Sequence, residues 1–392
     1  MFKDGVHAFY ANGLLRAFVL ALITIFVPVY VYERATATYG SVTIALLIVA
    51  LYFFVQRLVT LIVDVPVSHI IEKIGFRRSV GISVIFLMAH LSALIAMRTN
   101  FAYIWVATMC LSLNLPFYWI ARDSALSQDA ASQKMGRAMA GIAVLEKIAA
   151  LAGPFVAGMI ILRWGFGTLF IIALVLLAVS AVPLMWMPHH THKNGVSFTG
   201  FWLWVTGRRY FHQAVSQAGA AMEDYGLGVF WPLSLFIIGF NAGTLGAVFS
   251  GVAIVSVAVQ YVSGIVFDRL RRRGHEMDEV VFGFATVGTA LVWLVRLFIS
   301  TVFQVVAVDS FGQLFQTVYY GFQSDYAHLG GKRMGSIAFW VYLQMTYSIV
   351  ALFAFGLMAV GVYFGVWKEL LFLSTAWWVL VSVVQARETN LH

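Results

Sequence analysis

Long apolar runs follow one another along almost the whole chain, and short connections that carry most of the charged residues separate them. Within the runs, apolar and polar residues do not alternate with the period of two that is typical of strands in membrane barrels. Most runs approach the roughly 20 residues that a helix needs to cross the hydrocarbon core of a bilayer. The pattern predicts twelve membrane-spanning helices, near residues 9–32, 42–66, 79–97, 100–121, 138–163, 167–187, 213–238, 243–267, 278–298, 301–322, 335–363 and 368–386.

The composition agrees with a chain whose solvent is lipid. It is 61% hydrophobic and 11% charged, with a mean hydropathy of +0.87, which lies far outside the range of soluble domains. Because only helices and closed barrels satisfy their backbone hydrogen bonds in a bilayer, the expected fold class is an all-α membrane protein. The single cysteine, Cys110, excludes a disulfide framework. No cleavable signal peptide is expected, since a full-length span follows the first residues without a small-residue cleavage pattern.

Lysine and arginine residues are distributed unevenly between alternate connections. If both termini are cytoplasmic, 17 of these residues fall on the cytoplasmic side and four on the outer side. The positive-inside rule therefore predicts a multi-pass protein of the cell membrane with both termini in the cytoplasm. This topology accounts for the net charge of +8, so the basic balance does not indicate a nucleic-acid partner.

Two charged connections share one layout. SHIIEKIGFRRSV at 68–80 and GIVFDRLRRRG at 264–274 each place an acid and then bases at the end of an apolar run. Asp268 follows Glu72 by 196 positions, half of the 392 residues, and such a period indicates two homologous halves. The predicted domains are a first six-helix bundle at 1–187, a short cytoplasmic linker with an interfacial aromatic segment at 188–212, and a second six-helix bundle at 213–392.

The first of these connections resembles the cytoplasmic loop signature of the major facilitator superfamily, Gly-x-x-x-Asp-Arg-x-Gly-Arg-Arg. It departs from the signature at Ser68 and Glu72, and the second connection departs from it at Arg271. The resemblance implies twelve helices in two pseudo-symmetric bundles, a transporter that works by alternating access, and a cytoplasmic gate at these loops. The predicted gate residues are Asp64, Ser68, Glu72, Lys73, Gly75, Arg77, Arg78, Arg122, Gly264, Asp268 and Arg269.

Proline and glycine mark three of the predicted spans. Pro28 in the first span and Pro232 in the seventh predict the same kink in the first helix of each half. In the fifth span, Gly153, Pro154 and Gly158 resemble the glycine-proline signature of drug-exporting members of the superfamily. The alternative interpretation is close helix packing by small residues. The fourth span lacks the embedded arginine of many proton-driven exporters, which counts against the first interpretation.

Charged residues inside the spans cost roughly 2.5–3.5 kcal/mol each at a helix centre, so each requires a partner or a function. The bases are Arg16, Arg57, Lys147 and Arg296, and the acids are Asp64, Glu146, Glu223, Asp224 and Asp309. Their near balance predicts structural ion pairs, with Arg16, Arg57, Lys147 and Asp309 as partners. Arg296 lies near the outer end of its span and is expected to extend toward the membrane surface.

Glu223 and Asp224 are the leading candidates for proton coupling, and Glu146 is the third. Adjacent helical residues point about 100° apart, so Glu223 and Asp224 cannot share one partner, and at least one is expected to face a wet cavity. Neighbouring carboxylates in a low-dielectric environment increase one another's affinity for protons. A carboxylate of this kind can take up and release a proton as its surroundings alternate.

Polar and aromatic residues inside the spans predict a substrate cavity. The candidates are Tyr52, Gln56, Asn114, Tyr118, Trp119, Gln313, Gln316, Tyr320, Trp340 and Gln344. Aromatic walls with few polar groups suit an amphipathic or partly apolar substrate.

The predicted function is secondary active transport of such a small molecule, coupled to protons, with export favoured over import. Two alternatives keep the same fold: an uncoupled translocator of lipids or amphiphiles, and a proton-coupled importer of a polar solute. No enzyme and no metal site are expected, because the chain shows no histidine or cysteine cluster with metal-ligand spacing. The expected energy source is a proton gradient without a cofactor, and the expected partners of a monomer are the substrate and membrane lipids.

Overall fold

The structure is a computed structural model that describes the backbone of residues 2–129, 133–186, 195–207, 210–271, 276–334 and 336–383. Side chains are described for most of these residues, but not within 2–10, 125–147, 261–279 and 328–336 or at residues 150, 185, 186, 325 and 326. The described backbone contains helices and no strands.

The predicted all-α fold with twelve spans is confirmed. The elements are α1 (Phe2–Ile23), α2 (Phe26–Tyr39), α3 (Val42–Ile74), α4 (Phe76–Ala96), α5 (Tyr103–Asp129), α6 (Gln133–Ala181), η1 (Val182–Trp186), α7 (Phe198–Thr206), α8 (Phe211–Tyr225), η2 (Gly226–Phe230), α9 (Trp231–Ile238), α10 (Ala242–Arg271), α11 (Glu276–Arg296), α12 (Val302–Met334), α13 (Ser336–Phe364) and α14 (Trp367–Val381). Among the described residues, seven helical stretches are long and apolar enough to cross a membrane by length and composition.

Two glycines with positive φ replace loops between successive spans. Gly75 has φ +77° and is the only residue between α3 and α4. Gly165 has φ +79° and turns the chain inside α6, so that this element contains both the fifth and the sixth span. Residues with a Cβ rarely adopt this conformation, which explains why glycine stands at both turns.

The first helix of each half is irregular just before its proline. A proline cannot donate a hydrogen bond to the carbonyl four residues earlier. The chain turns between α1 and α2, where Thr24 lies four residues before Pro28. It widens into the π-helix η2 around Gly228, four residues before Pro232. The distortion predicted from the two prolines is therefore present in both halves.

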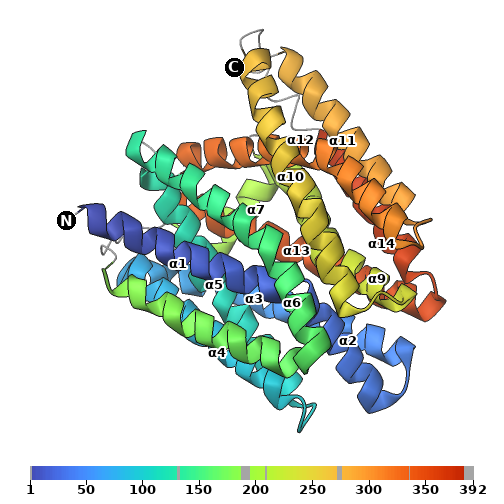
Figure 1. The fold of residues 1–392 in the computed structure, drawn as a ribbon. Helices are drawn as coiled ribbons and strands as arrows, with labels where there is room; N and C mark the ends of the chain where they lie inside the picture. The colour runs from blue at the N-terminus through green and yellow to red at the C-terminus, as the bar shows by residue number, and fades with distance from the viewer. Residues whose placement is uncertain are drawn as a thin grey trace.

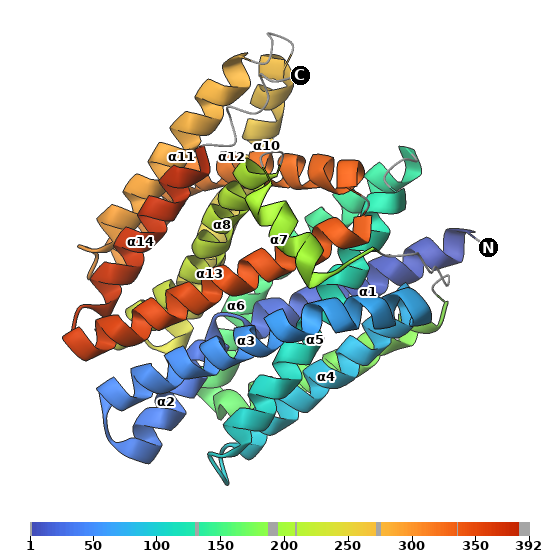
Figure 2. The same ribbon diagram turned by 180° about the vertical axis from the view of Figure 1, so that it is seen from behind.

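The helices form two bundles that meet along a seam. Figures 1 and 2 show α1 to α6 on one side and α8 to α14 on the other. Two helix pairs make most of the contact between the bundles, α3 with α13 and α6 with α10. The short helix α7 lies in the connection, where Trp204 packs against Phe339 and Tyr342 of α13.

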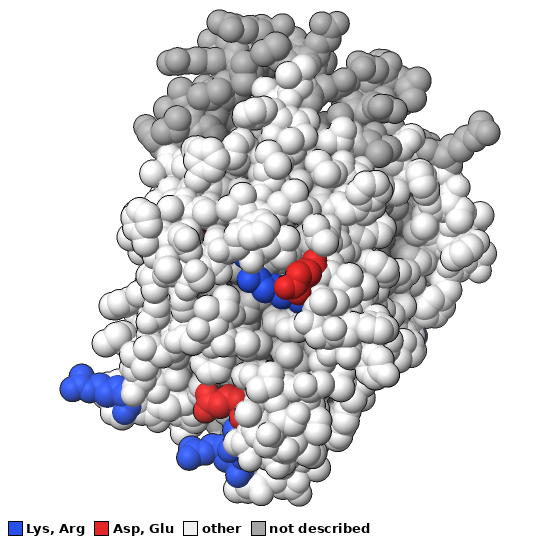
Figure 3. Space-filling view, turned by 90° about the vertical axis from the view of Figure 1, so that its right-hand side faces the viewer, with Lys and Arg blue, Asp and Glu red and all other residues white. Residues whose placement is uncertain are grey.

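Large apolar side chains cover much of the outer surface. Phe298, Phe303 and Tyr363 are each more than 80% exposed, at 82%, 81% and 81%. On the face in Figure 3, lysine, arginine, aspartate and glutamate are few and the surface between them is uncharged. Such a surface fits contact with lipid rather than with water.

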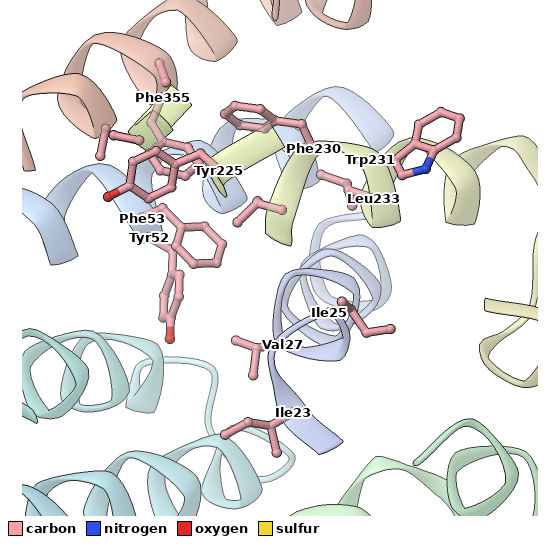
Figure 4. Packing of buried hydrophobic residues seen from close by; sticks show 14 of the residues in the cluster. Ile23, Ile25, Val27, Tyr52, Phe53, Tyr225, Phe230, Trp231, Leu233 and Phe355 are labelled. Carbon is pink, nitrogen blue, oxygen red and sulfur yellow. The ribbon is translucent and has the colours of Figure 1, made fainter. Parts of the chain in front are cut away.

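An aromatic cluster joins the bundles at the seam, and Figure 4 shows its members side by side. The rings of Phe53 in α3 and Phe355 in α13 stack with centroids 5.0 Å apart. Tyr225 in α8 and Phe230 in η2 meet the Phe355 ring edge-on, at 5.7 Å and 5.3 Å. Two members of this aromatic cluster, Phe53 and Tyr225, also line the cavity described next.

Candidate functional site

A cavity of about 630 Å³ lies between the two bundles. Its walls come from α1 to α5 in the first half and from α8, η2, α12 and α13 in the second. Thr24 and Gly228 line it where the first helix of each half is irregular. Asp123 and Ala327 line it near the opposite helix ends, so the cavity extends toward the face where the sequence predicts the cytoplasm.

Most of the cavity wall is apolar or aromatic. Leu20 and Leu87 contribute aliphatic surface, and Phe53, Trp119 and Trp340 contribute rings. His90 also lines the wall, but its Nδ1 lies 2.9 Å from the Ala107 carbonyl oxygen. The charged residues along the wall are Arg16, Arg57, Asp123 and Asp224.

Asp224 is the acid of the adjacent pair that faces this cavity. Its carboxylate is exposed to the cavity and accepts a hydrogen bond of 2.8 Å from the hydroxyl of Tyr320 in α12. Glu223 points the other way and is fully buried. It accepts hydrogen bonds from the indole of Trp293 and, at 2.9 Å, from the amide of Gln316. The turn of about 100° between adjacent helical residues separates the two environments.

A second buried network continues from Glu223 through the second half. Arg296 donates to Asp309 through Nε at 3.0 Å and through Nη2 at 2.9 Å. Trp231 donates to the other oxygen of Asp309 at 2.8 Å. Arg296 is only 1% exposed and lies over the ring of Trp293 at 4.3 Å. The expectation that Arg296 extends toward the membrane surface is wrong, because Asp309 on the neighbouring helix satisfies its charge inside the bundle.

Arg16 of α1 is equally buried but has neutral partners. Its guanidinium donates to the hydroxyl of Ser83 at 2.9 Å and to the amide oxygen of Asn114 at 2.8 Å. It lies 3.5 Å from the centre of the Tyr118 ring. Its Nε has no hydrogen-bond partner among the described residues.

Arg57 and Asp64 lie two turns apart on α3. Arg57 lines the cavity and lies 5.0 Å from the centre of the Tyr225 ring, and its Nε has no hydrogen-bond partner among the described residues. Asp64 is 0% exposed, and neither of its oxygens has a hydrogen-bond partner within the described part of the chain. Asp64 lies within α3, as expected for an acid inside a span, ten residues before the helix ends at Ile74, and its role in the gate stays a prediction. Arg57 interacts electrostatically with both Asp64 and Asp224.

The structure brings six of the ten predicted cavity residues together. Asn114, Tyr118, Trp119, Tyr320, Trp340 and Gln344 line the cavity. Four others do not line it, because they lie on neighbouring faces of the same helices. The backbone carbonyl of Gln56 in α3 accepts a hydrogen bond of 2.9 Å from the Ser112 hydroxyl in α5, and the buried Tyr52 lies one turn before Gln56 on the same face. Gln313 donates to Gln316 at 3.0 Å, and Gln316 donates to Glu223.

The predicted gate residues fall at the ends of α3, α4 and α5 and in α10. Ser68, Glu72 and Lys73 occupy the last two turns of α3, Gly75 the turn, and Arg77 and Arg78 the start of α4. Arg122 in α5 lies 3.9 Å from Asp123 and 5.0 Å from the ring centre of Trp119.

Several predicted side chains lie outside the described residues. In α10 these are Gly264, Asp268 and Arg269, and in α6 they are Glu146 and Lys147, although the backbone of both helices is described there.

The glycines of the fifth span lie at close helix contacts. A Cβ built on Gly153 would lie 2.5 Å from the Cβ of Ala21 in α1. A Cβ built on Gly158 would lie 2.5 Å from the carbonyl oxygen of Ala242 in α10. Gly158 therefore allows the backbones of the two halves to meet directly, as small residues do elsewhere in membranes.

Some residues of the site gave no sequence signal of their own. Asp123, Gln217 and Gln323 line the cavity near predicted helix ends, where polar residues are ordinary. Trp231 and Trp293 hold the buried carboxylates of the second half. Twelve tryptophans occur in the chain, so neither could be singled out by type.

The chain matches the model of the Major Facilitator Superfamily over residues 10–349. No curated protein matches it. The POT family transporter PepTSo has a TM-score of 0.76 at 9% identity, over 99% of this chain and 98% of that chain. A POT family transporter in complex with 5-aminolevulinic acid has a TM-score of 0.71 at 12% identity, over 97% and 94%. The E. coli fucose:proton symporter FucP has a TM-score of 0.64 at 13% identity, over 98% of each chain. At these identities the likeness to solved structures shows the fold alone.

Proposed function

Since the chain belongs to the major facilitator superfamily and is a membrane secondary transporter rather than an enzyme, we propose that it moves a small amphipathic molecule by proton-coupled alternating access. The observation that carries this proposal is the carboxylate of Asp224, which faces a cavity that both halves line. The cell membrane is the proposed location, with both termini in the cytoplasm.

Asp224 is suited to take up and release a proton. It is exposed to the cavity, so water and protons reach it, while apolar and aromatic side chains surround it. Its hydrogen bond from Tyr320 joins α8 to α12, so its protonation changes a contact between two helices of the second half. Glu223 is less suited, because Trp293 and Gln316 already occupy its oxygens away from the cavity.

The size and chemistry of the cavity support a small amphipathic substrate. A volume of about 630 Å³ falls inside the range of roughly 300–1,000 Å³ that is usual for small-molecule sites. Phe53, Trp119 and Trp340 offer flat apolar contacts, while Asn114 and Gln344 offer hydrogen bonds. The cavity lies at the seam, where rocking of one bundle against the other changes access to it.

The test reconstitutes the purified protein in liposomes with a pH gradient and an internal pH-sensitive dye. Candidate amphipathic compounds are added outside, and compound-dependent proton movement is measured for the wild type, for Asp224→Asn and for Glu369→Gln. Asp224→Asn should abolish proton movement while compound binding persists. Glu369→Gln removes an acid near the start of α14, away from the cavity, and should behave as the wild type.

Unchanged proton movement in Asp224→Asn would remove the coupling assignment. Transport by the wild type that ignores the pH gradient would instead identify an uncoupled translocator of amphiphiles. Which side of the membrane accumulates the compound decides between export and import.

A further inference from the structure

Two arginines of the first half line the cavity, and neither forms an ion pair with a described carboxylate. Arg16 in α1 and Arg57 in α3 both line it. Within the described residues, no carboxylate lies at ion-pair distance from either guanidinium. The Nε of each is buried and has no hydrogen-bond partner there.

The second half contains a buried arginine whose charge is neutralised by a carboxylate. Arg296 is as buried as Arg16, and Asp309 binds it through two hydrogen bonds of 3.0 Å and 2.9 Å. Arg16 receives only a hydroxyl and an amide oxygen, which carry no charge. Arg16 therefore brings a positive charge to the cavity wall without a bound carboxylate, and Arg57 has only its electrostatic interaction with Asp64 and Asp224.

The acids along the cavity are already engaged. Asp224 accepts a hydrogen bond from Tyr320 of the same half, and Asp123 lies 3.9 Å from Arg122. Asp64 is fully buried within α3 and does not line the cavity. A substrate that brings its own negative charge would complete the site on the first-half side.

The two arginines differ in how they are held. Two hydrogen bonds and the Tyr118 ring fix Arg16, so it contributes a steady positive potential behind that ring. Arg57 is only half-buried, lies 5.0 Å from the centre of the Tyr225 ring and interacts electrostatically with Asp64 and Asp224. Its guanidinium lines the cavity and has the geometry to bind two oxygens of one carboxylate.

We propose that the substrate carries a carboxylate that Arg57 binds directly, and that Arg16 reinforces this selection from behind Tyr118. The apolar remainder of the substrate packs against Phe53, Trp119 and Trp340. This inference rests on the proposed transport function and adds the charge of the substrate to it. Asp224 on the opposite wall stays available for the proton.

The test uses sets of matched compounds that differ only in the end group. Each set contains an acid, its amide and its amine on one body, with 4-phenylbutyrate, 4-phenylbutanamide and 4-phenylbutylamine as one set and shorter and longer aryl and alkyl bodies as the others. Binding to the full-length protein in detergent is measured by calorimetry and by the shift in melting temperature. In the wild type, at least one acid should bind tenfold or more tightly than its own amide and amine.

Variants assign this preference to residues. Arg57→Gln should remove the preference for the acid, Arg57→Lys should keep a weaker one, and Arg16→Gln should reduce it. Arg163→Gln removes an exposed arginine beside the α6 turn and should leave the preference unchanged. Melting temperature and gel filtration identify any variant that fails to fold, and Arg57→Lys then carries the comparison.

Two results would overturn the inference: no acid in any set binding better than its amide, or a preference that survives in well-folded Arg57→Gln. Both leave the proposed function in place if proton coupling still depends on Asp224. Conversely, a preference for acids in a protein that ignores the pH gradient would overturn the coupling and keep the inference.

Discussion

At the scale of single residues, the second half places two adjacent acids in opposite environments. Glu223 lies among Trp293, Gln316 and the other side chains of the bundle, whereas Asp224 faces the cavity. One carboxylate therefore contributes to the stability of the bundle, and the other remains available for chemistry. The same substitution at the two positions should have different effects.

Glu223→Gln should lower the stability of the protein more than Asp224→Asn. Glu223 accepts two hydrogen bonds while fully buried, and a lost charged hydrogen bond costs about 1.5–3 kcal/mol. Asp224 is exposed to the cavity, where water can replace its contacts with Tyr320 and Tyr347, so its replacement should cost less than about 1 kcal/mol. Thermal unfolding of both variants in one detergent checks the order, and the reverse order would contradict these environments.

The pair of Arg296 and Asp309 leads to a second prediction at this scale. Removing one partner, as in Arg296→Leu or Asp309→Leu, should destabilise the protein by about 3–5 kcal/mol, because it leaves a buried charge unpaired. Replacing both residues by leucine should cost less than either single change. Denaturant titration of the three variants measures the difference, and a double variant that is worse than both singles would refute it.

At the scale of elements, the contact of α6 with α10 depends on glycine. A Cβ on Gly158 would lie 2.5 Å from the carbonyl oxygen of Ala242, too close to be accommodated without moving a helix. The contact of α3 with α13 is made differently, since it includes the stacked rings of Phe53 and Phe355. The two halves therefore meet through two kinds of contact: close backbone packing between α6 and α10, and packing of large side chains between α3 and α13.

Gly158→Ala should destabilise the protein by about 1–3 kcal/mol and slow transport, because the two helices must separate to admit the methyl group. Gly251→Ala is the matched control on α10, where no atom lies within 4 Å of the added Cβ. It should be neutral or stabilising by up to about 1 kcal/mol, since alanine favours helix. Equal effects of the two changes would show that close packing at Gly158 does not matter.

Much of the element pattern could be predicted from the sequence. The twelve spans follow from apolar runs, and the irregularities before Pro28 and Pro232 follow from the missing amide hydrogen. The ends of the helices were harder to predict, because α3 and α12 continue as helices past the apolar runs, to Ile74 and Met334. Hydropathy marks where lipid ends and does not mark where a helix ends.

The partners of the charged residues could not be predicted in the same way. The sequence shows that Arg296 and Asp309 lie in successive spans, but their pairing depends on how two helices are rotated against each other. Rotation also decides that Phe53 and Arg57 line the cavity while Tyr52 and Gln56 lie on the neighbouring face of α3. One turn of about 100° per residue is enough to reverse such an assignment.

At the scale of the whole molecule, the two halves also meet beyond the aromatic cluster. The rings of Tyr32 in α2 and Phe236 in α9 lie edge-to-face at 6.1 Å. Phe53 and Tyr225 of that cluster line the cavity, whereas Tyr32 and Phe236 do not. In an alternating-access cycle, the contact of α2 with α9 must open when the cavity changes sides.

Joining this contact covalently should therefore stop transport without blocking the cavity. Tyr32→Cys with Phe236→Cys, in a chain where Cys110 is replaced by alanine, is treated with a short thiol cross-linker and tested in liposomes. Cross-linked protein should lose flux yet still bind compounds in detergent, and each single-cysteine variant should keep flux after treatment. Normal flux through fully cross-linked protein would exclude the opening of this contact.

The turn at Gly75 has a mechanical consequence for such a cycle. Because a single residue connects α3 to α4, a tilt of α3 should move α4 with it. The same coupling is expected between the two spans that Gly165 joins inside α6. The first bundle should then contain two pairs of helices, α3 with α4 and the two halves of α6, whose members move together. Spin labels placed on α3 and α4 should keep their separation while labels across the seam change theirs.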